Sequence, residues 1–185
     1  MKPFVIGIIF RCKEDGSVEI LTQRRLVKNK DYDPLYDRTW EAVGETLEKN
    51  ENVLDALVRG IREECGKPDD FEPEAIYGSK VIDLMNSEDW MSTTDKGDRY
   101  LVVEPFDFVQ SLGPPQPWIG PVFLVEVRYD FEPDHSKSDG EAGEPKWWSP
   151  EQLSQEIESS PKEFMGLHIS SLKKFANKVT AGRFP

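Results

Sequence analysis

The sequence predicts an α+β fold in which a mixed β-sheet lies between layers of helices, an α/β/α sandwich. Runs of β-branched and aromatic residues open the chain at Lys2–Cys12 and Val18–Arg24 and return in its second half. A single amphipathic segment, residues 51–66, separates the two groups of strands, and another helical pattern closes the chain. Strands on both sides of one helix, followed by a terminal helix, favour a sheet covered on both faces.

Composition limits the possible partners. The 185 residues suit one domain spanning 1–185. Lys and Arg number 23 against 35 Asp and Glu, so 23 − 35 gives a net charge of −12, which repels phosphate backbones and argues against a nucleic-acid partner. A small phosphorylated ligand stays possible, because a bound divalent ion reverses the local field.

The cysteine content and the hydropathy predict a cytoplasmic protein with no membrane span. Cys12 and Cys65 are too few for a disulfide framework and are expected as free thiols in a reducing compartment. The apolar run Phe4–Phe10 is too short for a targeting segment and is better explained as a buried strand. No stretch approaches the ~18 apolar residues of a membrane helix.

The first elements follow from turn chemistry. Lys-Glu-Asp-Gly-Ser, residues 13–17, is typical of a hairpin turn between the first two strands. Residues 28–38 are polar and are expected to form a loop, and Thr39–Val43 is expected to form a short strand that leads into Gly44.

The amphipathic segment has clear start and stop signals. Asn52, with Asp55 three residues on, is a suitable N-cap, and Gly66 followed by Pro68 ends the helix. An apolar stripe suited to packing on a sheet is formed by Val53, Leu54, Leu57, Val58 and Ile61.

The second half predicts three more strands and two helices. The expected strands are Ala75–Leu84, Tyr100–Leu112 and Pro121–Phe131, and the connections are Met85–Arg99, Gly113–Gly120 and an acidic loop, Asp134–Pro145, that is expected to be mobile. A short helix is expected from about Glu151, and a C-terminal helix over about 161–179, with Pro161 as its first residue.

Two adjacent carboxylates carry the predicted chemistry. Helical spacing places positions 60, 63 and 64 on one side, away from Leu57 and Ile61. Glu63 and Glu64 would repel each other unless a cation lies between them, and hard oxygen ligands suit Mg²⁺ or Mn²⁺. The alternative is an ordinary solvated helix face.

This helix resembles the Nudix box, G-x5-E-x7-R-E-U-x-E-E-x-G-U, where U is aliphatic. Three positions depart from the pattern, because Glu45 stands where the opening Gly belongs, Gly60 replaces the Glu after Arg, and Lys67 replaces the closing aliphatic residue. The matching positions are Glu51, Arg59, Ile61, Glu63, Glu64 and Gly66.

Weaker similarities extend the resemblance to most of residues 3–155. Ile20–Arg25 resembles the strand ending in Gln-Arg that precedes the box in many Nudix proteins, and Thr39–Gly44 resembles the Trp-x-x-Pro-Gly-Gly segment. Lys146–Leu153 resembles the Trp-containing strand and short helix that often close the domain.

The resemblance implies a metal-dependent hydrolase that cleaves the pyrophosphate bond of a nucleoside diphosphate linked to another moiety. Glu63 and Glu64 are then catalytic and hold Mg²⁺ or Mn²⁺, and Glu51 anchors the loop or adds a metal contact. The implied partner is a small nucleotide substrate, and since dimers are common among relatives, a homodimer is expected.

Other site residues have supporting roles in this prediction. Arg59 orients a neighbouring carboxylate and braces the helix, although a surface pair with Glu63 is the simpler explanation. Arg24 and Arg25 are candidates for binding substrate phosphate, and Gly44 for a tight backbone turn at the substrate. His135 and His168 match no ligand pattern and are expected at the surface or at helix caps.

Gly60 removes a carboxylate that Nudix enzymes use, and three outcomes follow. The site can hydrolyse slowly with another carboxylate, for which Glu141 and the catalytic candidate Glu144 lie in a suitable loop. The chain can instead be an inactive nucleotide-binding or regulatory module, or it can use a rearranged site. An isomerase-type relative is a weaker option, because Cys65 lies at the helix end rather than at a plausible active-site position.

Overall fold

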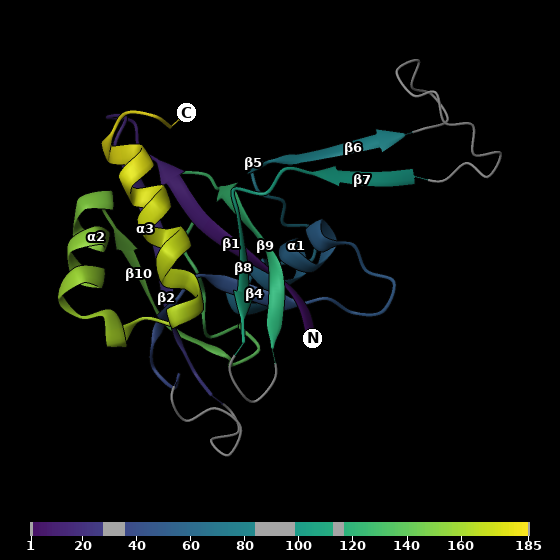
Figure 1. The fold of residues 1–185 in the computed structure, drawn as a ribbon, viewed down its shortest axis with the longest axis horizontal. Coiled ribbons are helices and arrows are strands. Elements are labelled where there is room, and N and C mark those ends of the chain that lie inside the picture. The colour runs from purple at the N-terminus through teal and green to yellow at the C-terminus, as the bar shows by residue number, and fades with distance from the viewer. Residues whose placement is uncertain (1, 28–35, 84–98, 113–116, 185) are drawn as a thin grey trace.

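The computed structural model of the chain describes residues 2–27, 36–83, 99–112 and 117–184, and within them it confirms an α+β fold with a mixed sheet flanked by helices (Figure 1). The first half contains β1 (Lys2–Cys12), β2 (Val18–Arg25), β3 (Trp40–Glu41), β4 (Val43–Thr46) and α1 (Val53–Glu64). The second half contains β5 (Ala75–Tyr77), β6 (Ser79–Asp83), β7 (Arg99–Val103), β8 (Asp107–Ser111), β9 (Trp118–Glu126), β10 (Ala142–Trp148), α2 (Pro150–Ser159), the 3-10 turn η1 (Pro161–Glu163) and α3 (Gly166–Thr180).

Strand β1 is the centre of the main sheet. The order is β10-β2-β1-β9-β5, with β3, β4 and β8 pairing to β2, β1 and β9. Pairing between β1 and β9 is parallel, with Ile6 opposite Val122, whereas the other pairs are antiparallel. Strands β6 and β7 form a separate ribbon that extends away from the main sheet (Figure 1).

Alternation along β1 builds a core on each face of the sheet. Phe4, Ile6, Ile8 and Phe10 are buried with residues of α2 and α3, while Val5 and Ile9 are buried with residues of α1. The helices accordingly lie on opposite sides of β1 and β9 (Figure 1).

A glycine sets how closely α1 approaches the sheet. A Cβ on Gly7 of β1 would lie 2.6 Å from Leu57 Cδ1, so the helix sits directly on the strand at this point. This contact fixes the position of the carboxylates at the C-terminal end of the helix.

The predicted ends of α1 are confirmed. Asn52 Oδ1 accepts hydrogen bonds from the backbone N–H of Leu54 (2.9 Å) and Asp55 (3.0 Å). Gly66 follows the helix with φ +61°, and a Cβ there would lie 2.0 Å from the carbonyl oxygen of Asp134. Only glycine tolerates both the left-handed conformation and the contact.

Several predicted strands are divided differently. The strand expected over Thr39–Val43 is interrupted at Ala42 and resumes as β4, so Gly44 and Glu45 are strand residues. The strand expected over Ala75–Leu84 is broken at Gly78, where φ is +90° and a Cβ would lie 2.0 Å from the carbonyl oxygen of Glu104.

The two later strands are also shorter than expected. Tyr100–Leu112 is split between β7 and β8 around Pro105, which has no N–H for a ladder. Pro121–Phe131 instead begins at Trp118 and ends at Glu126, because a turn follows in which Phe131 donates to the carbonyl oxygen of Arg128 (3.0 Å).

The acidic loop is shorter than the predicted Asp134–Pro145. Residues 142–145 belong to β10, which pairs with β2 through an irregular register between Ala142 and Pro145. The rest is held against the end of α1, where Asp134 N–H donates to the carbonyl oxygen of Cys65 (2.9 Å) and Asp139 N–H to that of Glu63 (3.1 Å).

The single C-terminal helix expected from Pro161 is divided. Pro161–Glu163 forms a 3-10 turn, and α3 begins only at Gly166. Between them the chain is extended, because Phe164 bridges to Trp40 and Met165 N–H donates to the Trp40 carbonyl oxygen (2.9 Å).

Most of the other predicted loops lie outside the described residues, namely 28–35, 84–98 and 113–116. Among the described residues, no helix combines the length and apolarity needed to cross a bilayer.

The prediction for His168 was wrong, because this side chain is buried rather than at the surface. It lies on the first turns of α3 and is 4% exposed. Its Nδ1 accepts a hydrogen bond from the backbone N–H of Ala42 (3.0 Å), so the ring is neutral. Burial, with a smaller contribution from the charge of Arg25, lowers the pKa of His168 to about 3.

The neutral His168 is expected to make the fold acid-sensitive. The unfolded chain binds a proton near pH 6.5 and the folded chain does not, so stability is present above that pH and is lost as the pH falls toward 3. As the pH falls from 6.5 to 5, protonation of His168 in the unfolded chain should lower the free energy of unfolding by about 2 kcal/mol.

Urea denaturation in EDTA at several pH values checks this. His168→Gln keeps an acceptor for Ala42 and should lose clearly less stability than the wild type over the same pH range. Equal losses in the two proteins would show that His168 does not titrate as described.

Candidate active site

A cavity of about 210 Å³ lies where β3, β4, the end of α1 and the start of α3 meet. Its wall is rich in carboxylates. They come from Glu41, Glu45, Glu64, Asp139 and Glu141, and the other lining residues include Lys2, Arg25, Gly44, Trp118 and His168.

Three separate parts of the chain deliver these carboxylates. Glu41 is on β3, opposite Gln23 of β2, and Glu45 is on β4, opposite Val5 of β1. Glu64 is the last residue of α1. The loop carrying Asp139 and Glu141 reaches the cavity because it is hydrogen-bonded to the end of that helix, as described above.

The cavity has more negative charge than its arginine balances. Arg25 Nη1 lies 3.2 Å from Glu41 Oε2, yet burial still raises the pKa of Glu41 to about 7. Burial also raises the pKa of Glu64 well above its ordinary value, and repulsion from Glu41 and Glu45 raises it further. Added positive charge would therefore favour the ionised forms of Glu41 and Glu64.

Gln23 stands behind Glu64. It is fully buried, and its Nε2 donates to Glu64 Oε2. Its Oε1 has no hydrogen-bond partner within the described structure, which is unusual for a buried amide. Glu64 is therefore held by a neutral donor.

The residues present fit a hard divalent cation. All of the acidic groups around the cavity offer carboxylate oxygens, the ligands that Mg²⁺ and Mn²⁺ prefer. In the parts of the chain that the structure describes, no three His, Cys, Asp or Glu side chains already converge as a ligand set. Binding would thus draw the carboxylates together and offset their repulsion.

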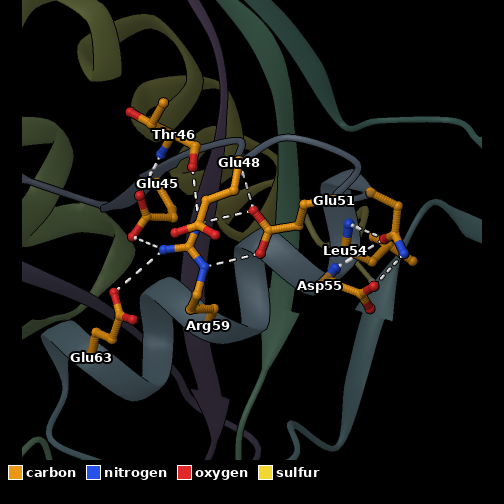
Figure 2. A network of polar contacts seen from close by, with 9 residues as sticks. Glu45, Thr46, Glu48, Glu51, Leu54, Asp55, Arg59 and Glu63 are labelled. Atoms are coloured by element: carbon orange, nitrogen blue, oxygen red, sulfur yellow. Dashed lines mark hydrogen bonds and ion pairs between the residues drawn. The ribbon is translucent and has the colours of Figure 1, made fainter.

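Arg59 organises a second group of acids beside the cavity (Figure 2). Its Nε and Nη2 each lie 2.9 Å from an oxygen of Glu51, and Nη2 also donates to the Thr46 carbonyl oxygen (2.9 Å). Its Nη1 lies 2.9 Å from Glu45 Oε2 and 3.4 Å from Glu63 Oε2. Arg59 lowers the pKa of Glu51, as expected for a paired carboxylate.

The structure separates the two carboxylates predicted to share a cation. Glu64 is buried in the cavity wall, whereas the side chain of Glu63 is 45% exposed and faces Arg59. Glu51 also pairs with Arg59 and does not line the cavity. Of the three predicted metal ligands, only Glu64 lines the cavity.

The predicted substrate-binding residues are also divided. Arg25 lines the cavity, but Arg24 stacks on Trp40, with Cζ 3.8 Å from the ring centroid, and lies 3.1 Å from Glu163. Gly44 lines the cavity from within β4, where a Cβ would make only ordinary contacts, so the tight backbone turn predicted there is wrong.

The two candidate loop carboxylates lie in different places. Glu141 lines the cavity, whereas Glu144 lines another hollow together with Arg24, Arg38 and Lys162. The inner residues of β10 alternate between partly buried and exposed, and Glu144 is one of the exposed ones.

Sequence reasoning missed Glu41, Glu45, Asp139 and His168 as cavity residues. Glu41 could have been found, because a carboxylate between Trp40 and Ala42 interrupts an apolar strand and needs a reason to be buried. Glu45 was recorded only as a departure from the box. Nothing in the sequence around His168 indicates its position.

Gly60 of α1 packs directly against Glu45 of β4. A Cβ on Gly60 would lie 2.8 Å from Glu45 Cβ and 3.3 Å from Glu45 Cγ. Gly60 is buried on the face of α1 that packs on β4. The helix tolerates a glycine there because a larger residue would collide with the strand.

A family model described as the NUDIX domain matches residues 1–166. No curated protein sequence is significantly similar to the chain.

Three solved structures illustrate the similarity of fold. A Caenorhabditis elegans Ap4A hydrolase binary complex is 13% identical with a TM-score of 0.55, covering 98% of this chain and 99% of that one. A possible asymmetric diadenosine tetraphosphate hydrolase from Jonesia denitrificans is 19% identical with a TM-score of 0.57, covering 100% and 96%. The NUDIX domain of Shewanella oneidensis NrtR, complexed with ADP ribose, is 11% identical with a TM-score of 0.55, covering 97% and 88%. At these identities the likeness concerns the fold alone.

Gly60→Ala should destabilise the protein, although alanine is the better helix former. The helix gains up to ~1 kcal/mol from the exchange, but overpacking against Glu45 costs about 1–3 kcal/mol. In a Glu45→Gly variant the obstructing Cβ and Cγ atoms are absent, so Gly60→Ala should raise the free energy of unfolding there.

A double-mutant cycle by urea denaturation measures both effects. If Gly60→Ala stabilised the wild type, the close approach of strand and helix described here would be wrong.

Proposed function

Because the chain belongs to the Nudix family, we propose that it is a metal-dependent hydrolase that cleaves the pyrophosphate bond of a nucleoside diphosphate linked to another moiety. The observation that supports this is the carboxylate-lined cavity at the end of the box helix, where Glu64 and Glu41 are buried with too little positive charge. A cation carried in with a phosphorylated substrate offsets that charge.

Similar structures guide the choice of substrates. The compounds named with them, Ap4A and ADP ribose, both contain a pyrophosphate linkage between a nucleoside and a second group. We carry this shared chemistry to the present chain and leave the second group open.

The proposed roles follow from each residue's place. Glu64 would hold Mg²⁺ or Mn²⁺ together with other cavity carboxylates. When bound, the ion polarises a phosphoryl oxygen and lowers the pKa of water. Arg25 points its charge toward the cavity and would bind a substrate phosphate, and Glu141 would accept the proton of the attacking water.

Arg59, Glu51 and Glu63 act indirectly in this proposal. Arg59 joins Glu51, on the loop before the helix, to Glu45 and Glu63, and so keeps strand and helix in register (Figure 2). Glu63 and Glu51, expected as ligands, are then positioning residues. Glu144 would act only if the β10 segment rearranged. Homodimer formation and a cytoplasmic location remain predictions from sequence.

Metal-dependent turnover tests the proposal. The wild-type chain should release phosphorylated products from ADP ribose, a nucleotide sugar, diadenosine tetraphosphate or a nucleoside triphosphate with Mg²⁺ or Mn²⁺, and EDTA should abolish release. Glu64→Gln keeps an acceptor for Gln23 but loses the charge, so kcat should fall by about 100-fold or more.

Glu48→Gln is the matched control, since Glu48 is an exposed carboxylate outside the cavity wall, and it should retain wild-type turnover. If no substrate gives products but calorimetry shows that a nucleotide still binds, the hydrolase proposal is wrong. The chain is then the alternative, a nucleotide-binding or regulatory module.

A further inference from the structure

Two departures from the family pattern coincide in space. Glu45 stands on β4 where the pattern has Gly, and Gly60 stands on α1 where the pattern has Glu. Their backbones approach so closely that a Cβ at position 60 would lie 2.8 Å from Glu45 Cβ. Full side chains cannot occupy both positions without a shift of strand or helix. One glycine and one glutamate satisfy the packing in the arrangement observed.

The side chain of Glu45 fills the volume that residue 60 leaves free. Its Oε2 lies 3.6 Å from the point where the side chain of residue 60 would begin. It lies against Gly60 and pairs with Arg59 Nη1 at 2.9 Å. Glu63 contacts the same guanidinium (Figure 2). The carboxylate is therefore present beside the helix, although it comes from the strand.

Glu45 also borders the cavity that holds Glu64. Both residues line its wall, Glu45 from β4 and Glu64 from the end of α1. Behind Glu64, the amide oxygen of the wholly buried Gln23 has no hydrogen-bond partner among the described residues. A cation would stabilise this group of oxygen atoms together with the two carboxylates.

We propose that Glu45 and Gly60 have exchanged roles, so that Glu45 supplies from β4 the carboxylate that the pattern places on the helix and, with Glu64, holds the divalent cation. This inference rests on the proposed function and names the residue that completes its site. Gly60 then marks a relocated ligand and not a lost activity.

The surroundings of Glu45 suit a ligand. Its backbone is fixed by pairing with Val5 of the central strand. Oε1 accepts the Thr46 N–H (2.6 Å) and Oε2 pairs with Arg59, which orients the carboxylate. Each oxygen retains a second lone pair for a cation.

A purely structural role, in which Glu45 only braces Arg59, makes a different prediction. Glu51 is also a partner of Arg59 but does not line the cavity. A bracing role predicts similar effects for Glu45→Gln and Glu51→Gln, mainly on stability. A ligand role predicts that Glu45→Gln weakens the binding of the cation much more.

Mn²⁺ affinity without substrate tests this, measured from the EPR signal of free Mn²⁺, with melting temperatures in EDTA recorded alongside. Glu45→Gln, which preserves shape, should weaken Mn²⁺ binding by about tenfold or more and clearly more than Glu51→Gln. Glu48→Gln is the control for loss of one nearby charge and should bind as the wild type does.

The exchange itself is tested by reversing it. Glu45→Gly and Gly60→Glu should each weaken Mn²⁺ binding. Gly60→Glu should also lower the melting temperature, because the new side chain collides with that of Glu45. The double variant Glu45→Gly/Gly60→Glu should regain a Kd within about threefold of wild type and regain thermal stability.

The outcomes separate the two proposals. A wild type that binds Mn²⁺ and turns over substrate, with Glu45→Gln binding equally well, overturns the role of Glu45 and leaves the hydrolase intact. A folded double variant without recovered binding also overturns the exchange. A wild type that binds no Mn²⁺ without substrate overturns the role of Glu45, and metal-dependent turnover then decides the hydrolase separately.

Discussion

The close packing of helix α1 on strands β1 and β4 determines where the functional carboxylates lie. The contact uses two glycines, because Gly7 admits Leu57 and Gly60 admits the side chain of Glu45. With the axis of the helix fixed at both points, Glu64 turns into the cavity and Glu63 turns toward Arg59. The loop that carries Asp139 and Glu141 then docks on the helix end through backbone hydrogen bonds. A shift of the helix would disperse all of these groups together.

The same packing creates an electrostatic cost. Glu41 and Glu64 are buried beside one another with Arg25 as a nearby cation, and burial raises the pKa of both. Burial with too little nearby positive charge disfavours the ionised form, which is why both pKa values are raised. Glu51, a partner of Arg59 that does not line the cavity, illustrates the contrast, since Arg59 lowers its pKa. The cavity is thus arranged for a ligand that brings positive charge, and the Arg59 cluster for holding the elements in register.

Much of the fold could be predicted from local signals. The hairpin of β1 and β2, the Asn52 cap and the end of α1 at Gly66 all follow from residue type and spacing. The breaks at Gly78 and before Gly166 could not, because they depend on contacts with Glu104 and Trp40, which are distant in sequence. The site was predicted less completely for the same reason. Glu45 and Gly60 are 15 positions apart and are two unrelated departures from the pattern in the sequence, and only their contact across strand and helix relates them.

The proposed site holds a cation between strand β4 and the end of α1. Crystals of the wild-type chain soaked in MnCl₂ and measured at a wavelength with strong manganese anomalous scattering would locate the ion directly. The account predicts an anomalous peak in the cavity, coordinated by the carboxylates of Glu45 and Glu64. A peak coordinated by Glu63 and Glu51 on the Arg59 side, with the cavity empty, would contradict it.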